Sequence, residues 1–246
     1  MSRYFLEVVY KGTAYSGFQS QINANSIQAE VEKAFAILQR EKVIMTGSSR
    51  TDAGVHALQN FFHFDYQGLI HPHFLYKMNS ILPSDIVIKT IRPLADECHC
   101  RFDAISRHYH YCIYQSKDPF LKDRAFYFPY KLDFEKMQEA SALIKEYQDF
   151  TSFSKRNTQA KTFLCEIMES DWSFKDNQLI YSVKANRFLR GMVRALVATM
   201  LQVGRNKLSI AGFRSIIEAK DCTQANFAVP AKGLFLKSVA YPGDYF

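Results

Sequence analysis

The chain has 246 residues, a length that fits one large domain or two closely packed smaller ones. It is 48% hydrophobic and 22% charged, which excludes a disordered chain and is typical of a globular protein. The formal net charge of +7 favours nucleic acid as a partner, because basic side chains release the counterions condensed on phosphates. A basic surface without a partner is the alternative.

Targeting and redox signals are weak. The number of cysteines is odd, 5, and their spacing suggests no disulfide framework, so we expect free thiols in a reducing compartment. The first residues, MSRYFLEVVY, do not read as a signal peptide. The longest apolar stretch, residues 192–203, contains Arg194 and is shorter than the roughly 20 residues that a membrane span needs. The sequence therefore predicts a cytoplasmic protein with no membrane partner.

In the first half, the hydrophobic pattern predicts strands over residues 4–10, 61–66 and 86–91 and helices over residues 25–39 and 74–81. Asn25 and Gln28 resemble a capping box for the first helix. Its apolar stripe at helical spacing consists of Ile27, Val31, Ala34, Phe35 and Leu38. The polar, glycine-bounded residues 47–54 predict a loop.

In the second half, the pattern predicts strands over residues 107–115, 163–170, 179–185 and 233–239, and helices over 188–203 and 210–219. Asp133 is expected to cap a further helix that runs to about residue 147. Neighbouring strands suggest hairpins rather than βαβ units, which favours the α+β class. We expect two similar α/β halves, residues 1–104 and 105–246, with mainly antiparallel sheets packed around a central basic cleft.

The loop over residues 47–54 carries the candidate catalytic carboxylate. In the run GSSRTDAGVHA, Asp52 lies two residues from Arg50 and two from Gly54. Glycine lets the backbone approach a substrate closely, and a cation within about 4–6 Å would keep the carboxylate ionised as a nucleophile or base. The alternative is an aspartate in a turn that pairs with its neighbouring arginine.

The strand expected over residues 107–115 carries aromatic and basic side chains. Because side chains alternate across a strand, Arg107 and Tyr109 share one face with Tyr111. A tyrosine beside an arginine could stack on a base while the arginine holds a phosphate. Packing of the aromatic rings in a core is the alternative, more so for Tyr111 than for Tyr109.

A second basic feature precedes the apolar stretch. Arg187, Arg190 and Arg194 are spaced three and four apart, which predicts one basic face near the start of the long helix over residues 188–203. Such a face could line a cleft that holds a phosphate backbone. The alternative is a core helix whose arginines form salt bridges.

Metal and cofactor motifs are weak. His71 with His73, and Cys98-His99-Cys100, could supply metal ligands, but neither matches a recognised zinc spacing, so no metal is expected. The sequence contains no G-x-G-x-x-G, no G-x-x-x-x-G-K-[ST] and no nucleophile elbow, so no nucleotide cofactor is expected.

Together these stretches resemble the TruA family of tRNA pseudouridine synthases, over nearly the whole chain and in the same order. The matching runs are YKGTAYSGFQSQ, GSSRTDAGVHA, RFDAISRHYHYCIY, DFTSF, ANRFLRGMVRALVATMLQVGRNKLS and GLFL. The joint match, led by the loop around Asp52, is highly specific. Ser20 replaces an Arg or Lys that the family often has, and His108 and His110 make their strand less basic, differences that bear on tRNA binding.

The resemblance implies a homodimeric enzyme that isomerises uridine to pseudouridine at the thirty-eighth to fortieth nucleotides, in the anticodon stem-loop of tRNA, without cofactor or metal. It implies that Asp52 is the catalytic carboxylate, Arg50 the arginine beside it, and Tyr109 the tyrosine that stacks with the target base. The base must leave its stack at a cost of a few kcal/mol, which a new stacking partner offsets by about 1–3 kcal/mol. The residues expected to contact the RNA backbone are Arg107, Arg187, Arg190 and Arg194.

The sequence leaves the chemical step open: Asp52 could attack C1′, add to the uracil C6 or remove the C2′ proton. Two other functions compete with this interpretation. A non-catalytic RNA-binding or RNA-chaperone protein would use the aromatic strand and basic helix alone. A metal-dependent RNA nuclease would use Asp52 and paired histidines as ligands.

Overall fold

The computed structural model describes residues 2–156, 158, 160–243 and 245. The chain divides into two compact units, which we call unit 1 (Met1–Ile105 with Phe235–Phe246) and unit 2 (Ser106–Leu234). The first division lies one residue from the boundary expected from the sequence. The last residues, however, return to unit 1 instead of completing the second half, because their strand pairs with a strand of unit 1.

Unit 1 is built on a sheet with the strand order β4-β1-β3-β9, and β2 also pairs with β3. The strands are β1 (Ser2–Tyr10), β2 (Thr46–Gly47), β3 (His56–Tyr66), β4 (Ile86–Leu94) and β9 (Leu234–Ala240). All pairs are antiparallel except β3 with β9, which is parallel. The strand predicted over residues 61–66 therefore begins earlier, at His56, directly after the Asp52 loop.

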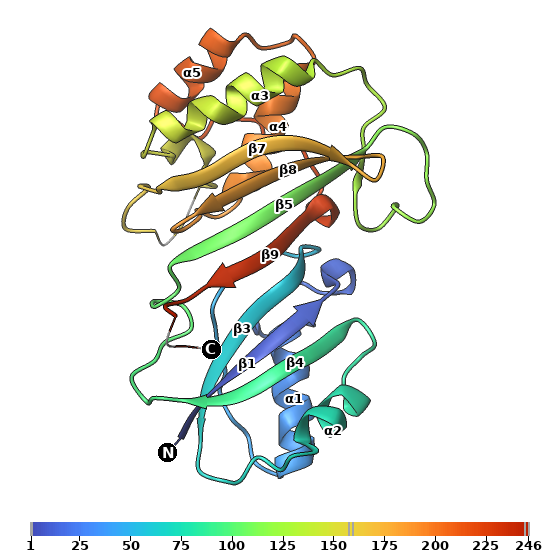
Figure 1. The fold of residues 1–246 in the computed structure, drawn as a ribbon, viewed down its shortest axis with the longest axis vertical. Helices are drawn as coiled ribbons and strands as arrows, with labels where there is room; N and C mark the ends of the chain where they lie inside the picture. Colours follow the sequence, from blue (N-terminus) through green and yellow to red (C-terminus); the bar gives the residue numbers. More distant parts are fainter. Residues whose placement is uncertain (1, 157, 159, 244, 246) are drawn as a thin grey trace. The chain divides into compact units, whose positions relative to one another are not determined.

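Two helices, α1 (Ile27–Gln39) and α2 (Phe74–Ile81), pack against this sheet (Figure 1). The ring of Phe35 on α1 lies 5.1 Å from that of Phe64 and 5.3 Å from that of Tyr66, both on β3. It also lies 5.4 Å from the ring of Phe74 on α2. One buried aromatic side chain thus joins both helices to the sheet. A 3-10 turn, Gly12–Ala14, follows β1.

The cap of α1 differs from the predicted one. Ser26, not Asn25, is the N-cap, and its hydroxyl oxygen accepts the backbone N–H of Ala29 at 3.2 Å. Gln28 does not close a capping box, because its amide oxygen accepts the N–H of Ser20 at 3.1 Å and its amide nitrogen donates to the carbonyl oxygen of Met45 at 2.8 Å. A tertiary contact of this kind is not visible in the local sequence.

Unit 2 has the strand order β5-β8-β7, all antiparallel, with β6 added to β5 in parallel. The strands are β5 (Ser106–Tyr114), β6 (Phe126–Tyr127), β7 (Ile167–Lys175) and β8 (Gln178–Ala185). The helices α3 (Phe134–Leu143), α4 (Met192–Gly204) and α5 (Ile210–Glu218) lie beside one another (Figure 1). Short 3-10 turns cover Ile144–Glu146, Thr151–Phe153 and Ala231–Gly233. Asp133 caps α3 as predicted, since it accepts the N–H of Lys136 at 3.1 Å.

Two predicted elements of unit 2 begin too early. The strand predicted from residue 163 starts at Ile167, because residues 163–165 bond instead to the segment 148–150. The helix predicted from residue 188 starts at Met192, because its N-cap, Gly191, has φ 76° and leaves the helical conformation.

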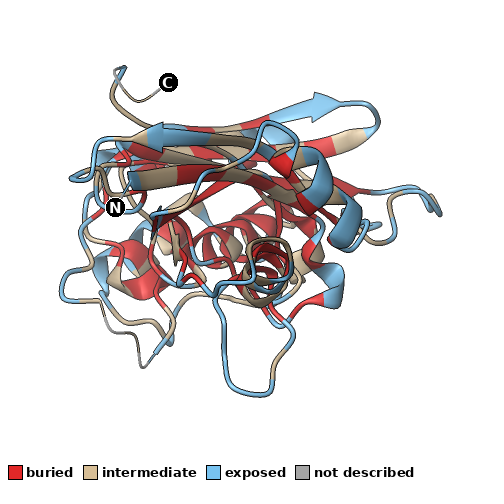
Figure 2. Ribbon diagram, turned by 90° about the horizontal axis from the view of Figure 1, so that it is seen from below, coloured by how far each residue is buried: buried red, intermediate tan, exposed pale blue. Residues whose placement is uncertain are grey.

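Buried residues are concentrated in the strands and helices, whereas the connecting loops are largely exposed (Figure 2). Each unit mixes helices with a mainly antiparallel sheet, which confirms the α+β class. Among the residues described, none of the helices combines the length and apolar character that crossing a membrane requires.

Candidate active site

The loop that carries Asp52 connects β2 to β3, and its backbone is fixed on both sides of the carboxylate. The N–H of Ser48 donates to Phe61 of β3 at 2.8 Å, and the N–H of Val55 donates to the carbonyl oxygen of Asp52 at 3.2 Å. Gly54 closes the turn with φ 78°, a conformation that favours glycine. The side chain of Asp52 is half-buried, so the carboxylate sits on a defined turn at the protein surface.

The first motif, YKGTAYSGFQSQ, packs directly against this loop. A Cβ atom added to Gly12 would lie 1.9 Å from the carbonyl oxygen of Val55, so only glycine fits there. The N–H of Gly12 donates to His56 Nδ1 at 3.1 Å. Gly17, with φ 124°, brings the chain alongside Thr51, whose carbonyl oxygen accepts the N–H of Phe18 at 3.1 Å. This motif therefore supports the Asp52 loop, a structural role that its residues alone do not indicate.

Arg50 is exposed, and its Nη1 donates to Gln19 Oε1 at 3.2 Å. Gln19 belongs to the first motif, so this bond ties the arginine to the neighbouring turn. The pairing of Arg50 with Asp52 that the sequence suggested stays a prediction.

Tyr109 and Arg107 lie on β5 in unit 2, and the alternation predicted for this strand is confirmed. Tyr109 and Tyr111 are buried, and His110 between them is half-buried. The hydroxyl of Tyr111 donates to the carbonyl oxygen of Pro230 at 2.8 Å, which places this tyrosine in the core. The ring of Tyr109 meets the edge of Phe188 with centroids 5.0 Å apart.

The three arginines near α4 do not share one helix face. Arg194 alone of the three lies within α4, because Arg187 and Arg190 precede the helix start at Met192. Arg194 donates from Nε and Nη2 to the carbonyl oxygen of Val229 at 3.0 and 2.6 Å, so its guanidinium serves the packing of unit 2. Arg190 is exposed and Arg187 half-buried.

Two further basic residues lie beside Arg190. The N–H of Lys155 donates to the carbonyl oxygen of Arg190 at 2.9 Å. Lys155 and Arg156 also line a cavity of about 390 Å³, together with Ser154, Cys222, Thr223 and Phe227. No local sequence pattern predicts this contact, because it joins segments about 35 residues apart.

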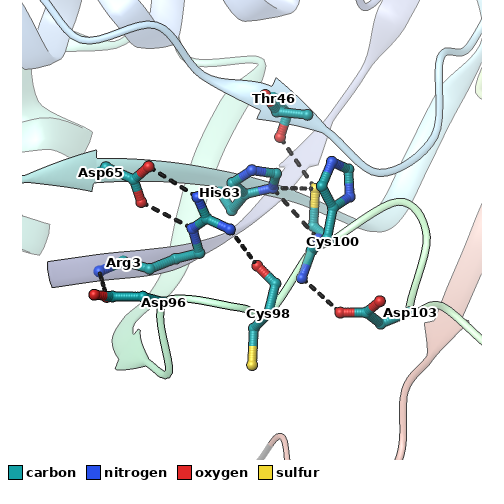
Figure 3. A network of polar contacts seen from close by, with 9 residues as sticks. Arg3, Thr46, His63, Asp65, Asp96, Cys98, Cys100 and Asp103 are labelled. Carbon is teal, nitrogen blue, oxygen red and sulfur yellow. Dashed lines mark hydrogen bonds and ion pairs between the residues drawn. The ribbon is translucent and has the colours of Figure 1, made fainter. Parts of the chain in front are cut away.

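The segment Cys98-His99-Cys100, a possible ligand set by sequence, takes part in a polar network of unit 1 (Figure 3). The Cys100 thiol donates to the carbonyl oxygen of Thr46 at 3.1 Å, and its sulfur lies 3.1 Å from His63 Nδ1. The carbonyl oxygen of Cys98 accepts from Arg3 at 2.9 Å. In the part of the chain that the structure describes, no three His, Cys, Asp or Glu side chains are grouped to hold a metal ion.

The structure thus places Asp52 and Arg50 on one loop of unit 1, and Tyr109, Arg107 and the three arginines near α4 in unit 2. Of the predicted site residues, Asp52 and Arg50 therefore lie in the same loop.

Comparison with known proteins gives consistent matches. A family model described as tRNA pseudouridine synthase matches residues 8–103 and 147–242. The chain is 45% identical to tRNA pseudouridine synthase A of Porphyromonas gingivalis, over 100% of both chains. It is 44% identical to tRNA pseudouridine synthase A of Parabacteroides distasonis, over 100% of this chain and 98% of the relative. It is 35% identical to that of Staphylococcus saprophyticus, over 96% of this chain and 90% of the relative.

Proposed function

The chain belongs to the tRNA pseudouridine synthase family, isomerases that act on tRNA, and we propose that it converts uridine to pseudouridine in the anticodon stem-loop, at the thirty-eighth to fortieth nucleotides. The observation that carries the proposal is the half-buried carboxylate of Asp52, held on a turn whose backbone is bonded on both sides. A catalytic group must be held in this way to meet a reacting atom.

Pseudouridine formation breaks the bond between N1 and C1′, turns the base, and joins C5 to C1′. The proton on C5 leaves and N1 gains one, so the reaction consumes no cofactor. An ionised carboxylate can serve this chemistry in three ways, by attack at C1′, by addition to C6 or by removal of the C2′ proton. Asp52 is the residue that we assign to this role.

A target base that is stacked in the stem-loop must be flipped out before it reacts, at a cost of a few kcal/mol. We assign Tyr109 as the stacking partner of the flipped base and Arg50 as the side chain that replaces it in the stem. The edge contact of Tyr109 with Phe188 holds the ring in a fixed orientation, which suits stacking. Replacement of Tyr109 by Phe should keep the activity, and replacement by Ala should reduce it. Equal losses in both would show that the hydroxyl matters more than the ring.

The basic residues of unit 2 are assigned to the RNA backbone. Arg190 is exposed, and the backbone N–H of the half-buried Lys155 donates to its carbonyl oxygen, so we assign this pair of basic residues to phosphates. Arg107 is tied by Nη1 to the carbonyl oxygen of Asn186 at 3.1 Å, and Arg194 is bonded to Val229. We therefore expect Arg190→Ala to weaken tRNA binding and to reduce its salt dependence by about one counterion. Arg194→Ala should chiefly destabilise unit 2.

The decisive experiment incubates unmodified tRNA transcripts with the protein and maps pseudouridine at single-nucleotide resolution. Asp52→Ala should keep tRNA binding and lose modification, and Asp96→Ala, an exposed aspartate of the same unit, should keep both. Modification by Asp52→Ala at the wild-type rate would refute the assignment. Intact tRNA after the reaction, with activity that survives a strong chelator, would exclude the metal-dependent nuclease.

The resemblance also implies a homodimer that works in the cytoplasm, where tRNA is modified. Light scattering should then give twice the chain mass of 28.4 kDa. A monomeric mass with full activity would refute the dimer.

A further inference from the structure

Four buried residues, two of them in the Asp52 loop itself, are joined by hydrogen bonds, and we call them the Asn60 network. They are Tyr10 (3% exposed), Ser49 (7%), Thr51 (8%) and Asn60 (0%). Ser49 takes part through its backbone, because its hydroxyl has no hydrogen-bond partner among the described residues. Burial of polar groups is costly unless their hydrogen bonds are made, so a cluster of this kind constrains its own geometry.

The side-chain amide of Asn60 makes all four hydrogen bonds that it can form. Its oxygen accepts the N–H groups of Ser49 at 3.2 Å and Phe61 at 2.9 Å. Its nitrogen donates to the carbonyl oxygen of Ser49 at 2.8 Å and to the hydroxyl of Tyr10 at 3.2 Å. An asparagine amide has two donors and two acceptor positions, so it is saturated. It fixes the backbone of Ser49 at both of its polar groups.

The hydroxyl of Tyr10 extends the network to the residue before Asp52. It lies 2.8 Å from Thr51 Oγ1, within hydrogen-bond distance. The carbonyl oxygen of Thr51 accepts the N–H of Phe18 at 3.1 Å, so Thr51 is held through its side chain and its backbone. The chain from Ser49 to Thr51 is therefore held by three side chains, those of Tyr10 on β1, Asn60 on β3 and Thr51 in the loop itself.

We propose that Tyr10, Thr51 and Asn60 are positioning residues for Asp52, which they set through the backbone of the loop. The proposal rests on the catalytic role of Asp52 given above. A catalytic group has to stay within about 0.5 Å of its productive position, and a displacement of about 1 Å can slow a reaction about 100-fold. Loss of the hydroxyl link between Tyr10 and Thr51 is expected to free the loop while both units stay folded.

The test uses two substitutions that each remove one hydroxyl with little change of shape, Tyr10→Phe and Thr51→Val, and the double variant. Single-turnover modification of a tRNA transcript at saturating enzyme should slow by about 10- to 100-fold in each single variant. The affinity for tRNA should stay within about twofold of wild type. Both substitutions break the Tyr10–Thr51 link, and Tyr10→Phe also removes the acceptor of Asn60 Nδ2, so the double variant should be no slower than Tyr10→Phe alone.

Two controls separate positioning from loss of stability. Thr51→Ser keeps the hydroxyl and should restore the rate towards wild type. Asn79→Ser removes a comparable side-chain clamp on the N–H and carbonyl oxygen of Ile88, at 2.8 and 2.9 Å, in the same unit but outside the network. It should lower thermal stability and leave the rate unchanged.

Wild-type rates in Tyr10→Phe and Thr51→Val would overturn the proposal, as would rate losses that multiply in the double variant. A rate loss in Asn79→Ser equal to theirs would also overturn it, because the effect would then follow stability. Asp52→Ala is measured in the same assay, and a wild-type rate in this variant would refute the proposed function itself. If Asp52→Ala is inactive but Tyr10→Phe has the wild-type rate, only the positioning role is refuted.

Discussion

Acidification is expected to destabilise unit 1 through one buried histidine, His63 on β3. Its ring lies in the network of Figure 3, where Nδ1 accepts the N–H of Cys100 at 3.3 Å. Burial, together with the nearby His99 and Arg3, lowers the pKa of His63 from 6.5 to about 4, against the opposing effect of Asp65 and Asp103. Protonation of Nδ1 would also remove the acceptor of the Cys100 N–H.

The sign and size of the effect follow from this pKa difference. Between a pH of about 4 and 6.5 the unfolded chain binds a proton at His63 that the folded chain does not, so stability falls as the pH falls. The stabilisation is complete above the unfolded pKa and is lost as the pH approaches the folded one. The gap corresponds to about 3 kcal/mol, a large fraction of the roughly 5–15 kcal/mol typical of a folded domain.

Urea unfolding followed by circular dichroism, at about pH 7 and about pH 4.5, measures this difference. His63→Asn keeps an acceptor near Nδ1 but cannot be protonated there, so it should lose about 2–3 kcal/mol less than wild type on acidification. His73→Asn, on the surface, is the matched control and should behave as wild type. Equal losses in wild type and His63→Asn would refute the reasoning.

Three further substitutions test the packing. Ser26→Ala should lower the free energy of unfolding by about 1 kcal/mol, because α1 loses its cap, whereas Ser26→Asn should keep the cap and the stability. Equal stability of wild type and both variants would contradict the assignment of the cap. Tyr111→Phe should lower the free energy of unfolding by about 1–2 kcal/mol, because the carbonyl oxygen of Pro230 loses its donor. The fluorescence of the single tryptophan, buried in unit 2, reports unfolding, and an unchanged unfolding midpoint would contradict this prediction. Gly47→Ala should cost about 1–3 kcal/mol, because the new Cβ would lie 2.1 Å from Phe18 Cε1; a thermal midpoint at or above wild type would show that the ring can move.

The sequence predicted correctly those elements whose determining residues lie within a few positions of one another. The helix Phe74–Ile81 has the predicted bounds, and the Asp133 cap and the alternation of β5 are confirmed. These features depend on capping chemistry and side-chain periodicity, which a sequence carries directly.

The errors arose chiefly where distant segments decide the outcome. Residues 163–165 alternate like a strand but bond to the segment 148–150. The late start of α4 has instead a local cause, the backbone conformation of its N-cap, Gly191. At the candidate site, the sequence indicated Asp52 but not the Asn60 network. Asn60 follows Ser49 by 11 residues and Tyr10 by 50, so their meeting requires the register of β1 with β3.

The return of the final strand to unit 1 has a consequence for biosynthesis. Unit 2 is one uninterrupted stretch of chain, so it can mature as soon as it has left the ribosome. Unit 1 has to wait, because β9 pairs with His56 and Ala57, at the start of β3 and just beyond the Asp52 turn. A polypeptide that stops before Phe235 leaves that strand edge uncovered and open to wrong partners. The part of the enzyme that bears the carboxylate can therefore be completed only after β9 has been translated.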